Sequence, residues 1–240
     1  MCIRDSARIA CVTPSHQFPG GGVMPLTRRL RLLDWAATNR TAVVEDDYDG
    51  EFRHEGRPIE CLHSLDRDGL VIHLGSASRN LFPALRIGWA VVPGPLVDAF
   101  LRLRAVTSSD TAGIEQLAFA DFVREGLLER HVRRVRKRLA GRRAALLDGL
   151  WRELGRRVEV AGASAGVHVL VRLRDLPATA FGSLREACLA RGVAIYSAGP
   201  SYAEPPPHME LLVGYASLAE EEIGVAVAKL REALDGLDSD

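Results

Sequence analysis

The first half of the chain places short β-prone runs around one stretch whose apolar residues recur at helical spacing. That stretch covers residues 26–37, and its apolar positions include Leu26, Leu30, Leu33 and Ala37. The β-prone runs lie at residues 9–12, 41–44, 70–74 and 87–92. Loops rich in Gly, Pro, Ser and Asp separate these runs, as turns require. The order strand, helix, strand predicts a buried parallel or mixed sheet flanked by helices.

The second half of the chain first has helical spacing of its apolar residues and then returns to the alternating pattern of a strand. Residues 95–154 have a helical pattern, which includes a long arginine-rich stretch from residue 127 onward. After it we expect an alternating strand, a helix and two further strands, at residues 167–173, 183–190, 193–196 and 210–216. Ser217 and Glu220 match a capping box at the start of a last helix. These elements predict a small α+β layer.

Composition limits the classes of protein to consider. The chain has 240 residues and a formal net charge of zero, enough for one large or two smaller globular domains. It contains no apolar run long enough to span a bilayer, and its first residues lack the apolar core of a signal peptide, so we expect a cytoplasmic protein with no membrane partner. The cysteines lack paired spacing and indicate neither disulfides nor a zinc site; they are Cys2, Cys11, Cys61 and Cys188.

Residues 74–89 have the character of a phosphate-binding loop. A serine-rich turn follows an apolar strand, and Arg86 comes shortly after it. Hydroxyls and a guanidinium can together hold a phosphate, the guanidinium in bidentate fashion. Arg79 lies in the same turn. Lysine is rare, with only Lys137 and Lys229 in the chain, so amine chemistry has few candidates.

A second polar cluster follows the β-prone run at residues 41–44. Residues 45–53 carry carboxylates at the carboxyl end of that strand, which is where ligands bind in an open α/β sheet. The same acids also suit a solvated loop, helix caps or a divalent-metal site. They do not have the ligand spacing of an EF-hand loop, and no histidine lies close enough in sequence to predict a transition-metal site.

These clusters resemble the aminotransferase-like domain of the MocR/GabR family. In that family a winged helix-turn-helix is fused to a fold-type-I domain that depends on pyridoxal phosphate. The resemblance begins near Ala7 and covers nearly the whole chain. It is carried by four segments in the same order, which read VTPSHQFP at residues 12–19, EDDYDGEF at 45–52, GSASRNLFPALR at 75–86 and HVRRVRKR at 131–138.

The resemblance implies a role for each matching residue. Asp46 would hydrogen-bond the pyridinium nitrogen of the cofactor, and Tyr48 would face its phenolic oxygen. Ser76, Ser78 and Arg86 would hold the phosphate. Arg79 occupies the position of the Schiff-base lysine, and a guanidinium is a poor nucleophile that stays protonated, so normal transamination should be abolished.

The loop before the first helix has two candidate residues. His16 and Gln17 lie where related enzymes place a polar side chain near the phenolic oxygen. Both residues equally suit a structural role in capping the turn before the helix. The strand at residues 210–216 has no arginine where many aminotransferases bind the substrate carboxylate, so the amino acid or amine that the domain would bind is unassigned.

The resemblance also predicts how the chain is divided. We expect a C-terminal fragment of the family's domain, with unmatched residues at 1–6, part of the large cofactor-binding domain at 7–110, a helical connector at 111–155 and the small domain at 156–240. A homodimer is the expected assembly. DNA would be bound only through a helix-turn-helix domain that this chain does not contain.

The arginine-rich stretch at residues 130–143 could in principle contact nucleic-acid phosphates. Its charges fall all around the helix, and acids elsewhere balance them, which favours a solvated connector over a DNA-binding surface. Three functions therefore remain: a catalytically impaired, cofactor-dependent effector domain of a transcription regulator, a working aminotransferase, and a ligand-free dimerisation domain. The first is the leading interpretation.

Overall fold

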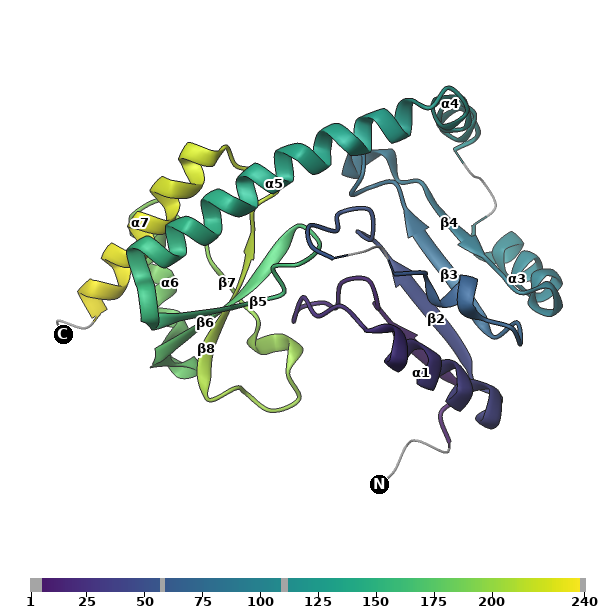
Figure 1. Cartoon of the computed structure of the whole chain (residues 1–240), viewed down its shortest axis with the longest axis horizontal. Coiled ribbons are helices and arrows are strands. Elements are labelled where there is room, and N and C mark those ends of the chain that lie inside the picture. Colours follow the sequence, from purple (N-terminus) through teal and green to yellow (C-terminus); the bar gives the residue numbers. More distant parts are fainter. Residues whose placement is uncertain (1–5, 57–58, 109–111, 238–240) are drawn as a thin grey trace. The chain divides into compact units, whose positions relative to one another are not determined.

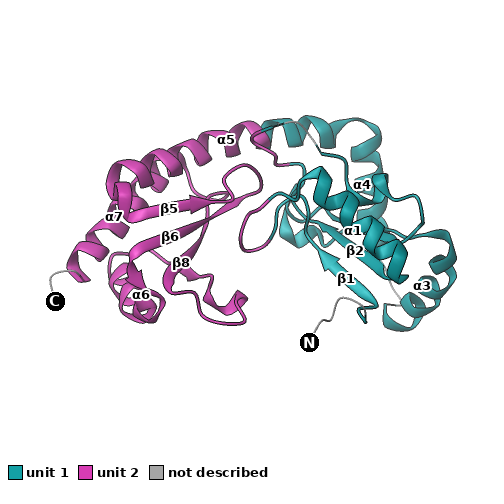
Figure 2. Cartoon of the chain, turned by 60° about the horizontal axis from the view of Figure 1, so that its bottom comes forward, with its two compact units in different colours: residues 1–17, 23–51, 56–135 teal, residues 18–22, 52–55, 136–240 magenta. Residues whose placement is uncertain are grey.

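A computed structural model describes residues 6–56, 59–108 and 112–237 (Figure 1). The chain divides into two compact units, shown in different colours in Figure 2. The first unit comprises residues 1–17, 23–51 and 56–135, and the second comprises residues 18–22, 52–55 and 136–240. Residues 1–5 of the unmatched N-terminal segment lie outside the described ranges. The boundaries predicted at residues 110 and 155 stay a prediction.

The first unit is built on a four-stranded mixed sheet in the order β1-β2-β3-β4. Its strands are β1 (Ile9–Val12), β2 (Ala42–Asp47), β3 (Val71–Ser76) and β4 (Gly88–Val91). The first three run parallel, and β4 is antiparallel to β3. This agrees with the predicted α/β class. Parallel pairing needs crossover connections, which is why helices cover the sheet.

Helices of the first unit are α1 (Leu26–Asn39), α2 (Leu62–Leu65), α3 (Gly94–Thr107) and α4 (Gly113–Arg124), with a 3-10 turn, η2, at Pro83–Leu85. The core beneath α1 and α2 joins Ala36, Val43, Leu62 and Val71, all fully buried. The helix α1 lies where its spacing predicted, but its buried face differs: Leu26 and Leu30 are exposed. Arg29 and Ala36 are the buried residues of α1.

A charged pair lies within this apolar core. Arg29 of α1 is 1% exposed, and its guanidinium donates to the carbonyl oxygens of Met24 (3.0 Å), Glu60 (3.0 Å) and Pro14 (2.9 Å). Its Nη1 lies 3.7 Å from a carboxylate oxygen of Glu45, which is fully buried on β2. A buried charge persists only when it is paired and hydrogen-bonded, and this guanidinium ties α1 to three loop segments and to the sheet.

The helices α3 and α4 have no buried residue. Large apolar side chains on them are exposed, among them Leu101, Leu103, Val106, Ile114 and Leu117. One aromatic residue of α4 does contact the sheet: Phe119 stacks on Trp89 of β4, with ring centroids 6.3 Å apart. Apolar faces of this extent are typical of surfaces that another polypeptide segment covers.

The second unit has an antiparallel sheet in the order β5-β6-β8-β7. Its strands are β5 (Val158–Ala161), β6 (His168–Pro177), β7 (Tyr196–Ser197) and β8 (His208–Gly214). The helices are α5 (Leu127–Leu154), which contains the division between the units, α6 (Phe181–Ala190) and α7 (Glu220–Leu237); 3-10 turns η3, η4 and η5 lie at Gly155–Arg157, Ala178–Ala180 and Gly199–Ser201. The predicted small α+β layer is therefore present.

Two local predictions in the second unit were wrong. The strand expected at residues 193–196 is reduced to the pair Tyr196–Ser197 at the edge of the sheet. The capping pair of α7 also differs, because Glu222, rather than Glu220, accepts a hydrogen bond from the backbone N–H of Ala219 at 2.7 Å. A carboxylate at that position satisfies a donor that would otherwise lack a partner at the helix start. Among the described residues no helix is long and apolar enough to cross a membrane.

The close pairing of β3 and β4 makes a stability prediction. Gly75 lies opposite Trp89, and a Cβ on Gly75 would overlap the indole ring. We expect Gly75→Ala to lower the free energy of unfolding by about 1–3 kcal/mol, the usual cost of overpacking. Urea denaturation followed by tryptophan fluorescence measures this. Gly94→Ala is the control, since a Cβ there meets no atom within 4 Å; equal stability of the two variants would contradict the close contact.

Candidate cofactor site

The topology of the first sheet gathers the predicted site residues at one edge. The strands β1, β2 and β3 are parallel, so their carboxyl ends lie together. The strand β4 is antiparallel and begins at that same edge, with Gly88 opposite Ser76. All eight predicted residues lie at these strand ends or in the loops beside them; they are His16, Gln17, Asp46, Tyr48, Ser76, Ser78, Arg79 and Arg86.

Asp46 lies near the end of β2, paired in register with Leu74 of β3. It is exposed, and side chains alternate along a strand, so it lies on the face opposite to buried Glu45. Partial removal from water raises the pKa of the Asp46 carboxyl, and the negative charge of Asp49 raises it further. A carboxylate in this setting gains from a cationic partner, which would favour its ionised form.

Tyr48 is held by the loop that follows β1. Its phenol donates to the backbone carbonyl of His16 at 3.0 Å. The His16 imidazole in turn lies 2.8 Å from a carboxylate oxygen of Asp49, and both side chains are buried. Burial raises the pKa of the Tyr48 phenol, and the charge of Asp49 adds to the effect. Gln17 is exposed, whereas His16 is buried and contacts both Tyr48 and Asp49.

The serine turn begins where β3 ends. The backbone N–H of Ser78 donates to the Ser76 hydroxyl at 3.2 Å, which folds residues 76–78 into a tight turn. Arg86 follows η2 with φ of 52°, a left-handed conformation rare for a residue with a side chain. Such backbone outliers cluster at ligand sites because the surrounding structure holds them in place. The Arg86 side chain is exposed.

Arg79 lies close to the same site. It is exposed, and its positive charge acts on the Tyr48 phenol, favouring the ionised form of that phenol. Tyr48 and Arg79 are therefore close enough for their charges to interact, although one follows β2 and the other follows β3. This proximity fits the arrangement that the family resemblance implies.

Sequence reasoning missed the residues that hold the serine turn in place. Asn80 is 3% exposed, and its side-chain amide donates to the Glu51 carboxylate at 2.7 Å. The imidazole of His131, near the start of α5, lies 2.8 Å from the backbone carbonyl oxygen of Asn80. Burial raises the pKa of the Glu51 carboxyl. Glu51, Asn80 and His131 each fall within a quoted motif, but no local spacing signal links them.

The side chains of this site offer hydrogen-bonding groups that match the parts of a phosphorylated pyridine. Asp46 offers an incompletely hydrated carboxylate for a ring nitrogen, and Tyr48 offers a phenol on an adjacent loop. Ser76, Ser78 and Arg86 offer hydroxyl and guanidinium donors for phosphate oxygens. These residues fit such a ligand. Position 79 does not fit covalent attachment, because a guanidinium is a poor nucleophile.

Comparison with known proteins defines the class of fold. The structure superposes on LysN, an α-aminoadipate aminotransferase from Thermus thermophilus solved in complex with N-(5'-phosphopyridoxyl)-L-leucine, with a TM-score of 0.86 and 29% identity over 95% of this chain and 59% of that one. The fold is therefore that of the fold-type-I, pyridoxal-phosphate-dependent aminotransferases. The family model "Aminotransferase class I and II" matches residues 8–230, so the chain belongs to that family.

The similar curated proteins include transcription regulators. The chain is 40% identical to the uncharacterized HTH-type transcriptional regulator YhdI of Bacillus subtilis over 96% of its length and 49% of that protein's. It is 34% identical to the probable rhizopine catabolism regulatory protein MocR of Rhizobium meliloti, over 98% of this chain and 48% of MocR. The chain thus spans about half the length of these relatives, and its resemblance to MocR-type regulators is confirmed.

Proposed function

We propose that the chain is the pyridoxal-phosphate-binding effector domain of a MocR/GabR-type transcription regulator. The supporting observation is that one sheet edge gathers all eight predicted site residues, with an arginine at position 79. The similarity to transcription regulators and to an aminotransferase with a bound phosphopyridoxyl group also supports this proposed function. In this proposal the cofactor is held without a covalent bond.

Each residue of the site would act on a different part of the cofactor. The Asp46 carboxylate would accept a hydrogen bond from the ring nitrogen and keep it protonated. Tyr48, oriented by its hydrogen bond to the His16 carbonyl, would contact the phenolic oxygen. Ser76, Ser78 and Arg86 would hold the phosphate. When bound, the cofactor supplies a cationic ring that withdraws electrons from an attached amino group.

Arg79 changes the outcome of that binding. Its guanidinium stays protonated, so it supplies neither a nucleophile nor a base for moving the α-proton of an amino acid. It can still contact a phosphate or a carboxylate. The domain would then bind the cofactor, or an amino acid or amine effector beside it, without turnover. Binding would shift the population of conformations or the geometry of a homodimer.

The remaining parts of the proposal concern partners. DNA would be bound through a helix-turn-helix domain of the kind that the relatives' names describe, and a regulator of this type would act in the cytoplasm. The long helix α5 would serve as a connector, because acids pair with several of its arginines, as Glu129 does with Arg133 and Glu153 with Arg152.

Titration with pyridoxamine 5'-phosphate tests the proposal. Its amine cannot react with protein lysines, so only non-covalent binding is measured. We expect saturable binding by the parent chain and affinity about tenfold or more weaker in Asp46→Asn, since a hydrogen bond to a charged group contributes about 1.5–3 kcal/mol. The measurement is isothermal calorimetry at fixed pH.

Asp34→Asn is the matched control, an exposed aspartate on α1 that should leave the affinity unchanged. Binding unaffected by Asp46→Asn would reject the assigned site. Absence of binding by the folded parent chain would reject the proposed function.

A ligand-free dimerisation domain is the second candidate, favoured by the exposed apolar residues of α3 and α4. A working aminotransferase is less well supported. The lysines Lys137 and Lys229 both belong to the second unit, whereas every predicted cofactor residue belongs to the first. If the chain sediments as a stable dimer and does not bind pyridoxamine 5'-phosphate, the ligand-free dimerisation function is favoured.

A further inference from the structure

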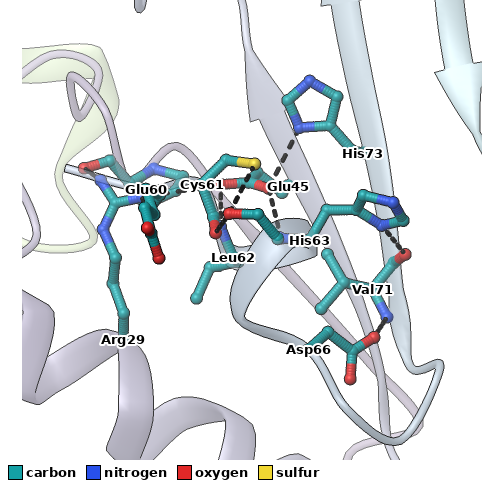
Figure 3. Close-up of polar contacts among 11 residues, drawn as sticks. Arg29, Glu45, Glu60, Cys61, Leu62, His63, Asp66, Val71 and His73 are labelled. Carbon is teal, nitrogen blue, oxygen red and sulfur yellow. Dashed lines mark hydrogen bonds and ion pairs between the residues drawn. The ribbon is translucent and has the colours of Figure 1, made fainter. Parts of the chain in front are cut away.

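Three side chains of types that can bind metals lie close together on the face of the first sheet that α1 and α2 cover. Glu45 of β2 and His73 of β3 are register partners, so their side chains lie side by side on one face. Cys61 immediately precedes α2. One ligand atom from each of these three residues lies within 4.8 Å of the other two. Figure 3 shows Glu45, Cys61 and His73 converging from separate elements.

We propose that Glu45, Cys61 and His73 form a binding site for Zn²⁺. Thiolate, imidazole and carboxylate are the three ligand types that zinc uses in proteins. Bond lengths of about 2.0–2.3 Å place the ligand atoms of a tetrahedral zinc roughly 3.3–3.8 Å apart. The ligand atoms, all within 4.8 Å of one another, would have to move by up to about 1 Å to reach that spacing. The sequence left a divalent-metal site open for the acids at residues 45–53, but it did not connect Glu45 with Cys61 and His73, because the sheet register and the fold, rather than local spacing, bring these ligands together.

Surrounding groups hold the carboxylate in position. The backbone N–H groups of Leu62 and His63 donate to the two oxygens of Glu45 at 2.7 and 3.0 Å. The Glu45 side chain is fully buried, while 15% of the His73 side chain is exposed. Fixed outer contacts of this kind orient metal ligands and tune their affinity. Partial exposure of His73 gives an ion a path to the site.

The charge and proton balance also suit a divalent cation. Glu45 and a Cys61 thiolate carry two negative charges, and Arg29 lies 3.7 Å from Glu45, so the ion would leave one net positive charge. The His73 Nδ1 now lies 3.0 Å from a Glu45 oxygen. Binding the metal through that nitrogen would require the neutral imidazole to carry its proton on Nε2 instead, and the thiol would lose its proton to solvent, so one proton is released per ion bound.

A fourth ligand is available nearby. The imidazole rings of His63 and His73 have centroids 6.3 Å apart. The His63 Nδ1 now lies 3.3 Å from the Val71 carbonyl oxygen, a contact that His63 would have to leave in order to bind the ion through this nitrogen. Water would otherwise complete the tetrahedron, since an open fourth position is common in zinc sites with three protein ligands.

Metal titration of the chelator-treated chain tests this proposal. We expect one Zn²⁺ per chain by equilibrium dialysis with elemental analysis, and a thiolate-to-metal absorption band in the near ultraviolet when Co²⁺ replaces zinc. Cys61→Ser should abolish the band, and Cys61→Ser and His73→Phe should each lower the affinity by more than the roughly 10- to 100-fold typical of outer contacts. Glu45 is left unchanged because it also pairs with Arg29.

The exposed Cys11 on β1 supplies the matched control. Cys11→Ser should keep both the stoichiometry and the band. In the parent chain, Zn²⁺ should slow alkylation of Cys61 by iodoacetamide and leave Cys11 unprotected, a readout that requires no variant. A band that survives Cys61→Ser, or equal alkylation of Cys61 with and without Zn²⁺, would overturn the proposal.

Discussion

Replacing Arg79 by lysine is expected to turn reversible binding of pyridoxal phosphate into covalent binding at residue 79. The proposed site holds groups suited to the cofactor's ring and phosphate, with Asp46 and Tyr48 at one strand end and the serine turn at the next. At position 79, arginine stands where a nucleophile would be needed for covalent binding. A lysine beside a positively charged neighbour or partly removed from water has a lowered pKa, which makes its amine reactive near neutral pH.

Borohydride reduction followed by peptide mass mapping measures this effect. Arg79→Lys should acquire one phosphopyridoxyl group per chain at residue 79, while the parent chain should carry none there. Arg31→Lys is the control for indiscriminate labelling, because Arg31 is exposed on α1 in the same unit. If residue 79 were labelled no more than residue 31, position 79 would not be the point of attachment.

Loss of the buried cation is expected to be the most destabilising of the substitutions considered. Arg29→Met should lower the free energy of unfolding by about 3–5 kcal/mol, because removing one partner of a buried pair leaves an uncompensated charge on Glu45. Hydrogen bonds to three backbone carbonyls are lost at the same time. Urea denaturation followed by circular dichroism measures the difference.

Arg31→Met on the same helix is the matched control. Arg31 is exposed, and surface substitutions usually change stability by less than about 0.5 kcal/mol. Matching unfolding midpoints for the two variants would show that Arg29 makes no net contribution to the core.

The sequence predicted the parts of the fold that local patterns determine. Runs of β-branched residues located the strands of the first sheet, and apolar spacing located α1. The apolar spacing did not predict which face of α1 is buried, since Arg29 contacts loop carbonyls far away in sequence. The short strand β7 was also misplaced, because edge pairing depends on a neighbouring strand rather than on its own residues.

The candidate site was predicted as a set of motifs rather than as a geometry. Asp46 and the serine turn follow adjacent strands, and parallel pairing explains why they share an edge. The contact of Tyr48 with the His16 carbonyl and the contacts of Asn80 with Glu51 and His131 join segments between 29 and 51 positions apart. Contacts over that separation depend on the complete fold, so no local spacing could reveal them.

The alternation of side chains along β2 places the two proposed sites on opposite faces of one strand. Glu45 and Asp46 are consecutive residues that face opposite sides of the sheet. Zinc at Glu45 would affect the cofactor only if it also changed the position or charge environment of Asp46. Any effect of zinc on the affinity for the cofactor must be matched by an equal effect of the cofactor on the affinity for zinc. One strand would thus allow the chain to report metal supply and cofactor supply as a single combined signal.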